Sequence, residues 1–205
     1  MHGILEHLGV AVAAVTGVLA AKGKRVDLFG VLVLALVTAF GGGTLRDVVL
    51  GDTPVFWVSD PSFTITASVT AVATFFIARA RELPSNILRI ADAAALAFFT
   101  MLGAQKALTL GFAPHIAIVM GVITGVVGGM CRDVLIGQIP LVFRRDIYLY
   151  ATAATFGALI FIILEKVRPG AAENLPIGAG ITLSLRLIGI RWRISLPVFG
   201  DEQEK

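Results

Sequence analysis

The chain carries the same glycine–arginine–aspartate pattern twice, and each copy lies inside a long apolar segment. Residues 42–54 read GGTLRDVVLGDTP, and residues 128–140 read GGMCRDVLIGQIP, 86 positions later. The identical pairs are Gly42/Gly128, Gly43/Gly129, Arg46/Arg132, Asp47/Asp133, Val48/Val134, Gly51/Gly137 and Pro54/Pro140. Ionisable side chains inside apolar spans are rare and usually face the protein interior or a water-filled cavity. The repeat therefore predicts two related halves around a polar interior.

Composition indicates a membrane protein. Hydrophobic residues make up 57% of the 205 residues, charged residues make up 15%, and the mean hydropathy is +0.88. A soluble domain carries about 25% charged residues, so this chain would leave too much apolar surface in water. The net charge of +3 is the small Lys and Arg excess typical of cytoplasmic loops, and it does not indicate nucleic-acid binding. The single cysteine, Cys131, excludes a disulfide within the chain.

Seven segments are apolar and long enough to span a bilayer, which takes roughly 20 residues. They are residues 4–21, 27–50, 63–80, 88–108, 114–137, 147–165 and 174–191. The turns between them are short, so we expect residues 1–205 to form a single all-α transmembrane domain. The first segment has some features of a cleaved signal peptide. No Lys or Arg precedes it, however, and the repeat maps it onto the fourth segment, so we keep it in the mature protein.

The basic residues of the short loops predict the orientation, because cytoplasmic loops carry an excess of Lys and Arg. On the opposite face, Lys166 and Arg168 are offset by Glu165 and Glu173. We expect the N-terminus outside, the C-terminus in the cytoplasm, and Trp57 and Trp192 at the membrane interfaces. The basic residues on the cytoplasmic face are Lys22, Lys24, Arg25, Arg79, Arg81, Arg89, Arg144, Arg145, Arg191 and Arg193.

The offset of 86 residues maps the first three spans, about 4–80, onto the next three, about 88–165. The last span, about 174–191, has no partner. Because three is an odd number, the second copy enters the membrane from the opposite side. The sequence therefore predicts a 3+3 inverted repeat plus one C-terminal helix. Inverted repeats with interrupted helices recur in transport proteins, whose substrate sites lie near the midplane between the repeats.

The glycines of the motif predict a broken or kinked helix in the second and fifth spans. Gly41 to Gly43 lie about fifteen residues into the second span, or roughly 22 Å along a helix at 1.5 Å per residue. Each glycine costs about 1 kcal/mol relative to alanine in a helix interior. A break would free backbone carbonyls and amides. Thr38 and Thr124 come one turn earlier, where their hydroxyls would bond freed carbonyls or face a path.

The charged part of the motif, Arg46-Asp47 and Arg132-Asp133, follows each glycine run by about one turn. Two interpretations stay open: the charges only pack two helices together, or they line a polar path. Neighbours on a helix point about 100° apart, since there are 3.6 residues per turn. We therefore expect pairing across the repeats, Asp47 with Arg132 and Asp133 with Arg46.

Other polar residues of the spans allow two interpretations each. Lys106 near the end of the fourth span either snorkels to the interface or has a role in a pore or its gating. Glu6 and its repeat equivalent Asp92 either lie at helix starts, where they are solvated or pair with the helix dipole, or form a proton relay. Arg186 in the last span either snorkels or serves a subunit contact. Cys131 has Leu45 as its repeat equivalent, which favours a packing role.

The stretches AFGGGTLRDVVLGDTPVFW and GVVGGMCRDVLIGQIP, in a chain with seven apolar segments and a three-plus-three repeat, resemble the prokaryotic branch of the trimeric intracellular cation channel (TRIC) family. The resemblance covers nearly the whole chain. It implies a homotrimer in which each protomer holds its own pore, formed by the second and fifth spans and kinked at the glycines. Val127 replaces the first glycine of the second copy, which makes that hinge stiffer or shifts it.

The resemblance also separates this chain from the eukaryotic members, which bind phosphoinositide lipid and carry a longer basic tail. This chain ends in GDEQEK, so we do not expect a phosphoinositide site. The pore candidates are the hinge glycines Gly41, Gly42, Gly43, Gly128 and Gly129 and the polar residues Thr38, Arg46, Asp47, Lys106, Thr124, Arg132 and Asp133.

The leading hypothesis is a passive channel for monovalent cations, potassium over sodium, in the inner membrane of a prokaryote. Its expected partners are its own copies, membrane lipid and the permeant cation. A secondary transporter of a small zwitterion such as glycine is the alternative, since inverted repeats also suit alternating access. A non-transporting assembly protein with a dry interior is a third class. The chain lacks HExxH, GxSxG and metal-ligand spacing among its three histidines, so we expect no enzyme, cofactor or metal site.

Overall fold

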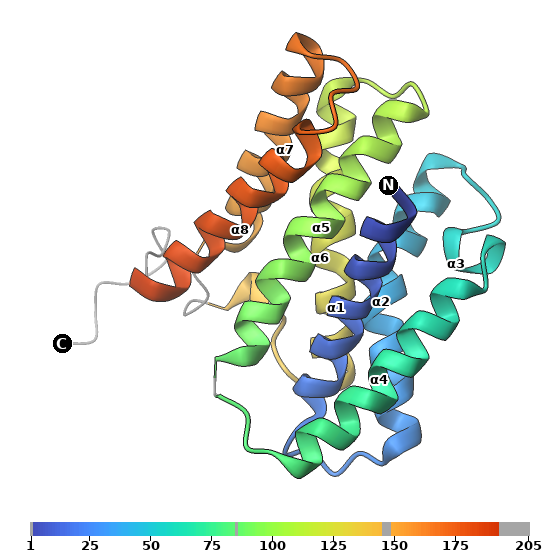
Figure 1. The fold of residues 1–205 in the computed structure, drawn as a ribbon, viewed down its shortest axis with the longest axis vertical. Helices are drawn as coiled ribbons and strands as arrows, with labels where there is room; N and C mark the ends of the chain where they lie inside the picture. The colour runs from blue at the N-terminus through green and yellow to red at the C-terminus, as the bar shows by residue number, and fades with distance from the viewer. Residues whose placement is uncertain (1, 85, 145–148, 193–205) are drawn as a thin grey trace.

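The protein is a bundle of long α-helices, without a strand in the part of the chain that the structure describes (Figure 1). A computed structural model describes residues 2–84, 86–144 and 149–192. The predicted basic residues Arg145 and Arg193, the start of the predicted span 147–165 and the GDEQEK tail lie outside these ranges. The elements are α1 (His2–Ala21), α2 (Leu28–Leu50), α3 (Phe56–Ser59), α4 (Ser62–Ala80), α5 (Ile87–Thr109), α6 (Pro114–Leu135), the 3-10 helix η1 (Leu141–Phe143), α7 (Tyr150–Val167) and α8 (Asn174–Trp192).

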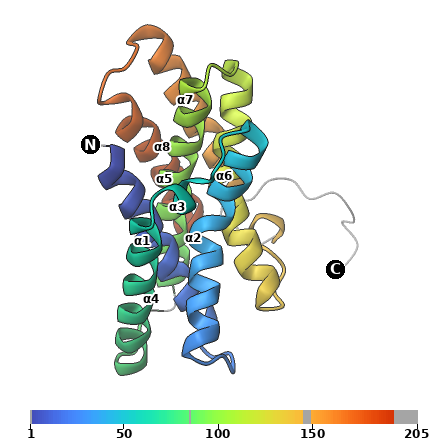
Figure 2. The ribbon, with the colours of Figure 1, turned by 90° about the vertical axis from the view of Figure 1, so that its right-hand side faces the viewer.

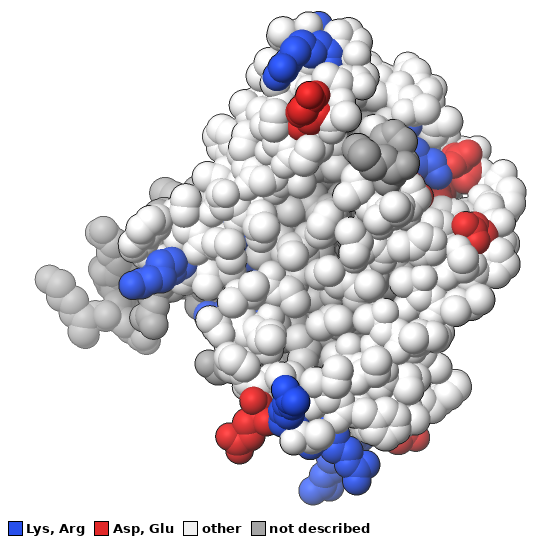
Figure 3. Space-filling view, viewed as in Figure 1, with Lys and Arg blue, Asp and Glu red and all other residues white. Residues whose placement is uncertain are grey.

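Six of these helices are long and apolar enough to cross a membrane, namely α1, α2, α4, α5, α6 and α7. Helix α8 is 19 residues long but less apolar, and it does not meet the same criterion. On the face in Figure 3, charged side chains lie at the top, at the bottom and at the two side edges, and the centre of the face is almost free of charge. The prediction of an all-helical membrane protein is therefore confirmed.

The helices form two packed groups of three. Helices α1, α2 and α4 contact one another, and so do α5, α6 and α7. The groups meet chiefly where α2 packs on α6 and α1 packs on α5, and α8 lies against α5 and α7 (Figures 1 and 2). Small residues permit these close approaches: a Cβ on Gly17 of α1 would lie 2.6 Å from Ala35 Cα of α2.

The ends of the two motif helices explain further identities in the repeat. Gly51 ends α2 with φ 72°, and Gly137 follows α6 with φ 68°, a left-handed conformation that favours glycine. The start of α2 is capped by Asp27, whose Oδ1 accepts a hydrogen bond from Gly30 N at 2.8 Å. A short helix follows each motif, α3 after the first and η1 after the second. The hydropathy pattern did not predict either of them.

Helix α3 folds back over the motif of α2. Trp57 donates its indole N–H to Thr44 Oγ1 at 3.0 Å, and its ring stacks on Phe40 with the ring centroids 5.3 Å apart. Half-buried in this way, Trp57 covers part of α2. The loop between α2 and α4 is thereby fixed beside Arg46 and Asp47.

Candidate functional site

Helices α2 and α6 cross at the glycines of the repeated motif. A Cβ built on Gly42 would lie well inside 3.0 Å of the Thr124 carbonyl oxygen, and a Cβ on Gly128 equally close to the Thr38 carbonyl oxygen. Real Cβ atoms essentially never come that close. The contact is reciprocal, since Gly128 and Thr124 are the repeat equivalents of Gly42 and Thr38. Glycine is therefore required at these two positions so that the two backbones can touch.

Of the two forms expected for the second and fifth spans, a broken helix is wrong, and a kinked helix stays a prediction. Helix α2 is continuous through Gly41, Gly42 and Gly43, and α6 is continuous through Gly128 and Gly129. A break would leave backbone groups unsatisfied, and each such group costs several kcal/mol in hydrocarbon, against about 1 kcal/mol for a glycine within a helix. The continuous helix is thus favoured, and the glycines serve the crossing instead.

The two threonines are buried on the inner sides of this crossing. Thr38 Oγ1 donates to Leu34 O and Thr124 Oγ1 donates to Met120 O, each at 2.6 Å and each one turn back along its own helix. Because the hydroxyl hydrogens point back along the helix, the oxygen lone pairs stay available as acceptors. The threonine pair adds polar oxygens to an otherwise apolar crossing.

A small polar cavity lies at the crossing. Its volume is about 10 Å³, which is at the lower limit for one water molecule. The interior at this level is therefore too narrow for a cation with its hydration shell. The cavity is lined by polar residues and glycines, Thr16, Thr38, Gly42, Asp92, Thr124, Gly125, Gly128, Gly129 and Arg132, together with Ala13, Ala39, Ala95, Leu96 and Phe99.

On one side of the crossing lies the Lys106 cluster, which consists of Arg46, Asp47, Asp52 and Lys106. Arg46 Nε donates to Asp47 Oδ1 at 2.8 Å, and Lys106 Nζ lies 2.9 Å from the same oxygen. Lys106 also pairs with Asp52. Asp47 Oδ2 accepts a hydrogen bond from Phe56 N at 2.9 Å, which ties α3 to the cluster. The Lys106 ammonium group is thus paired with two carboxylates and does not extend freely to the membrane interface.

On the other side lies the Arg186 cluster, which consists of Asp92, Arg132, Asp133 and Arg186. Arg132 Nε donates to Asp133 Oδ1 and Arg132 Nη1 donates to Asp92 Oδ1, both at 2.9 Å. Arg186 Nη2 lies 4.0 Å from Asp92 Oδ2, and the Arg186 guanidinium lies 4.6 Å from the ring centroid of Tyr150. Both arginine side chains are fully buried.

The predicted pairing across the repeats is wrong, because each arginine binds the aspartate beside it. The contacts of Gly42 with Thr124 and of Gly128 with Thr38 set an antiparallel register. In that register Arg46 lies opposite position 120, which is 12 residues from Arg132, or about 18 Å at 1.5 Å per residue. The motifs therefore diverge from the crossing in opposite directions, and of the two motif aspartates each arginine reaches only the neighbouring one.

Sequence reasoning missed part of the Arg186 cluster. Asp92 is 3% exposed and paired with Arg132, so the interpretation that it lies solvated at a helix start is wrong. Tyr150 was not singled out at all. The available signals were a carboxylate at the repeat equivalent of Glu6 and an arginine, Arg186, alone in an apolar span. Each suggested a polar role without naming a partner.

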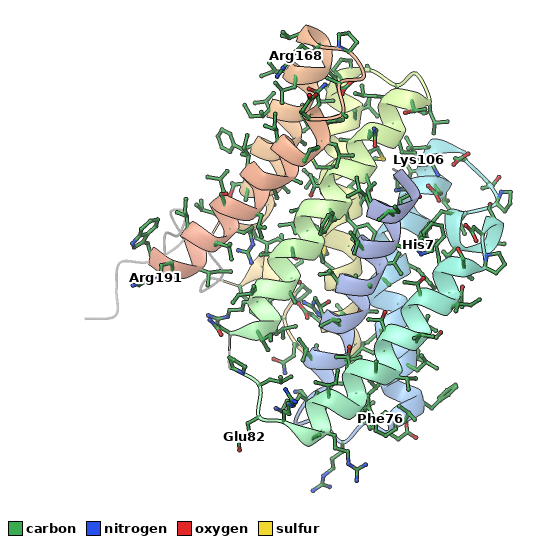
Figure 4. All side chains as sticks on the ribbon, in the orientation of Figure 1. His7, Phe76, Glu82, Lys106, Arg168 and Arg191 are labelled. Atoms are coloured by element: carbon green, nitrogen blue, oxygen red, sulfur yellow. The ribbon has the colours of Figure 1, made fainter. Side chains whose placement is uncertain are left out.

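The two clusters carry the same formal charge. Each contains two cationic side chains and two carboxylates, so each sums to zero. Each combines an arginine and an aspartate of the motif with one cation from a different helix, Lys106 of α5 or Arg186 of α8. Figure 4 places Lys106 near the same end of the molecule as Arg168 and far from Glu82.

The chain matches a family model described as "Glycine transporter" twice, over residues 3–79 and again over residues 89–166. It is 45% identical over 201 residues to the UPF0126 inner membrane protein YadS of Escherichia coli K12, which covers 97% of this chain and 96% of that protein. These matches extend over nearly the whole chain, and the double match follows the spacing of the motif.

Solved structures of the same fold are equally close. The TRIC orthologue from Rhodobacter sphaeroides superposes with a TM-score of 0.87 at 39% identity, over 93% of this chain and 97% of that one. A second structure, solved to explain conductance through TRIC cation channels, superposes with a TM-score of 0.86 at 32% identity and covers 98% of both chains. The chain therefore belongs to the prokaryotic branch of the trimeric intracellular cation channel family.

Proposed function

We propose that this protein is a passive channel for monovalent cations, potassium over sodium, and that each protomer of a homotrimer holds its own path between α2 and α6. The observation that carries the proposal is the reciprocal glycine crossing with its polar cavity, flanked on both sides by charge-balanced clusters. The similar solved structures are of TRIC cation channels, which supports the same activity here.

The proposed setting is the inner membrane of a bacterium, as the name of the YadS relative supports. Seven spans, with α8 as the seventh, form a 3+3 inverted repeat plus one helix. The N-terminus lies outside and the C-terminus in the cytoplasm, since the basic loops then face the cytoplasm. In this orientation the Lys106 cluster lies toward the outer surface and the Arg186 cluster toward the cytoplasm.

Conduction requires the crossing to widen, because the cavity of about 10 Å³ holds about one water molecule at most. The glycines of α2 and α6 permit this movement: without side chains, the helices slide or bend at the crossing without a steric clash. Lys106 closes the outer side through its ion pairs with Asp47 and Asp52. We assign Lys106 the gating role rather than snorkelling for this reason.

The arginines of the motif do not repel a passing cation in this arrangement. Asp47 pairs directly with Arg46, and Asp133 with Arg132, so each positive charge is balanced at hydrogen-bond distance. The side-chain oxygens of Thr38 and Thr124 are available to replace part of the ion's hydration shell. These oxygens surround the narrowest part of the proposed path.

A planar-bilayer recording on the purified protein tests the proposal. With asymmetric potassium chloride we expect unitary current steps and a reversal potential near that of potassium. Replacing potassium by sodium on one side then gives the preference between the cations, and native mass spectrometry gives the number of subunits. A reversal potential near that of chloride would overturn the proposed selectivity. Complete absence of unitary currents would refute the channel; if glycine accumulation in proteoliposomes were absent as well, an assembly protein with a closed interior would be favoured.

A transporter of a small zwitterion is the second candidate, because the matching family model is described as a glycine transporter. Its expected carboxylate site at half-helix N-termini near Gly43 and Gly129 is not present, since both helices are continuous. Proteoliposomes loaded with unlabelled glycine distinguish the two candidates. Accumulation of radiolabelled glycine without unitary currents would support the transporter, and currents without accumulation would support the channel.

A further inference from the structure

We infer that Arg186 of α8 is a built-in counter-ion of Asp92, and that it limits how strongly the proposed path attracts cations on its cytoplasmic side. The inference rests on the proposed function and deepens it, because it names a residue outside the repeated motif that sets ion preference. Arg186 acts through Asp92 and is therefore a positioning residue rather than a pore-lining one.

Asp92 is the carboxylate most directly exposed to the central cavity. It lines that cavity together with Thr38, Thr124 and Arg132, whereas Asp47 and Asp133 do not line it. One of its oxygens, Oδ1, accepts a hydrogen bond from Arg132 Nη1 at 2.9 Å. The other, Oδ2, is buried and accepts no hydrogen bond from the residues that the structure describes. A carboxylate oxygen in this position attracts any cation that enters the cavity.

Arg186 supplies the charge that opposes this attraction. Its Nη2 lies 4.0 Å from Asp92 Oδ2, close enough for Coulomb attraction but beyond hydrogen-bond distance between these two atoms. Arg186 itself does not line the cavity. Its guanidinium is held by the ring of Tyr150 at 4.6 Å and is fully buried, so its charge is not screened by water. Arg186 therefore acts as the counter-ion of Asp92, a role that a permeant cation would otherwise have.

The net charge of the Arg186 cluster predicts the direction in which ion preference changes when Arg186 is replaced. The Arg186 cluster sums to zero with Arg186 present and to one negative charge without it. Helix α8 has no counterpart in the repeat, so this cation is an addition to the duplicated plan. A merely structural role, in which Arg186 only fastens α8 to α5 and α7, predicts no relation between ion preference and net charge.

The experiment compares four proteins in bilayers under a potassium chloride gradient: the wild type, Arg186→Gln, Asp92→Asn and the double variant. We expect Arg186→Gln to raise the potassium-to-chloride permeability ratio on the order of fivefold, for one charge roughly 10 Å from the ion at an effective dielectric constant between that of a protein surface and water. Asp92→Asn lowers the ratio by a similar factor. The double variant returns to within about twofold of the wild type, because its cluster is again neutral.

Two matched controls separate charge from packing. Arg186→Lys keeps the charge without the planar contact to Tyr150, and we expect a ratio near that of the wild type. Arg191→Gln removes an exposed arginine from the same helix and is expected to leave the ratio unchanged. An unchanged ratio in Arg186→Gln, or a shift in the same direction for both single variants, would overturn the inference.

The inference can still be tested if one of these variants does not assemble. If Arg186→Gln does not assemble, Asp92→Asn and the double variant answer the same question, and lack of recovery in the double variant refutes the pairing. A wild type without unitary currents refutes the proposed function instead. The counter-ion pairing is then measured from melting temperatures, where a double variant no more stable than Asp92→Asn alone would refute it.

Discussion

The glycine crossing makes a quantitative prediction that compares two adjacent residues, Gly41 and Gly42. A Cβ on Gly42 would lie well inside 3.0 Å of Thr124 O, whereas a Cβ on Gly41 would lie 3.6 Å from Gly128 Cα, an ordinary van der Waals contact. Both alanine substitutions gain the same helix propensity, about 1 kcal/mol per residue. The difference between the two variants therefore isolates the cost of forcing the backbones apart.

The magnitude follows from the contact distances. To restore the ordinary 3.4 Å contact, α2 and α6 must separate at Gly42 by more than 0.4 Å against backbone atoms that cannot rotate away. Overpacking of this kind typically costs about 1–3 kcal/mol. For a chain of 150–250 residues, each kcal/mol corresponds to about 2–4 °C, so Gly42→Ala is expected to melt about 2–12 °C below Gly41→Ala.

The assay is thermal unfolding of the purified variants in one detergent, followed by bilayer recording of both. We expect Gly41→Ala to melt about 2–4 °C above the wild type, from its gain in helix propensity, and to keep the wild-type conductance. We expect Gly42→Ala to melt below Gly41→Ala and to change unitary conductance. Equal melting temperatures for the two variants would show that the backbones do not touch at Gly42. Equal conductance despite unequal stability would show that the crossing does not lie on the ion path.

Three further predictions concern the repeat, the gate and the topology. Gly128→Leu is expected to lower the melting temperature further than Gly42→Ala, and to abolish or strongly reduce flux in the protein that assembles, because its side chain would overlap the Thr38 carbonyl; unchanged conductance would contradict this. Lys106→Gln is expected to raise the open fraction in single-channel recordings, because Asp47 loses a cation at 2.9 Å, and an unaltered open fraction would remove Lys106 from the gate. Cysteines at position 24 or 81, in a Cys131→Ser background, are expected to react with an impermeant reagent from the cytoplasmic face; labelling from opposite faces would contradict the inverted repeat.

The long elements could be predicted from sequence because hydropathy alone determines them. The six helices that can cross a membrane lie within a few residues of segments expected from apolar length. Gly51 and Gly137 also had a local explanation, since both end a motif helix in a left-handed conformation. These features depend on residues close together in the chain, and their energetics are local.

The pairing of charges could not be predicted, because it depends on how two helices are set against each other. The angle between neighbours on one helix favours cross-pairing, but the arginine side chain is long enough to overcome that angle. Arg46 Nε reaches back to Asp47 at 2.8 Å despite that angle. The glycine contacts set the register of α2 against α6, and in that register Arg132 lies far from Asp47. The sequence alone does not show which carbonyl oxygen each glycine contacts.

The duplicated motif therefore has two separable roles, and the pattern of substitution within it reflects them. The glycines fix the crossing through contacts that are reciprocal between the halves, so both copies must keep them at Gly42 and Gly128. Each arginine–aspartate pair instead serves its own side: one aspartate oxygen binds the arginine, and the other accepts a hydrogen bond from the segment that follows, Phe56 N in one half and Leu141 N in the other. The arginine and the aspartate of each pair therefore come from the same half of the repeat. The second cation of each cluster comes from a helix outside the motif. That is why the two sides can differ, with a partly exposed lysine on one side and a buried arginine on the other, while the crossing between them stays symmetric.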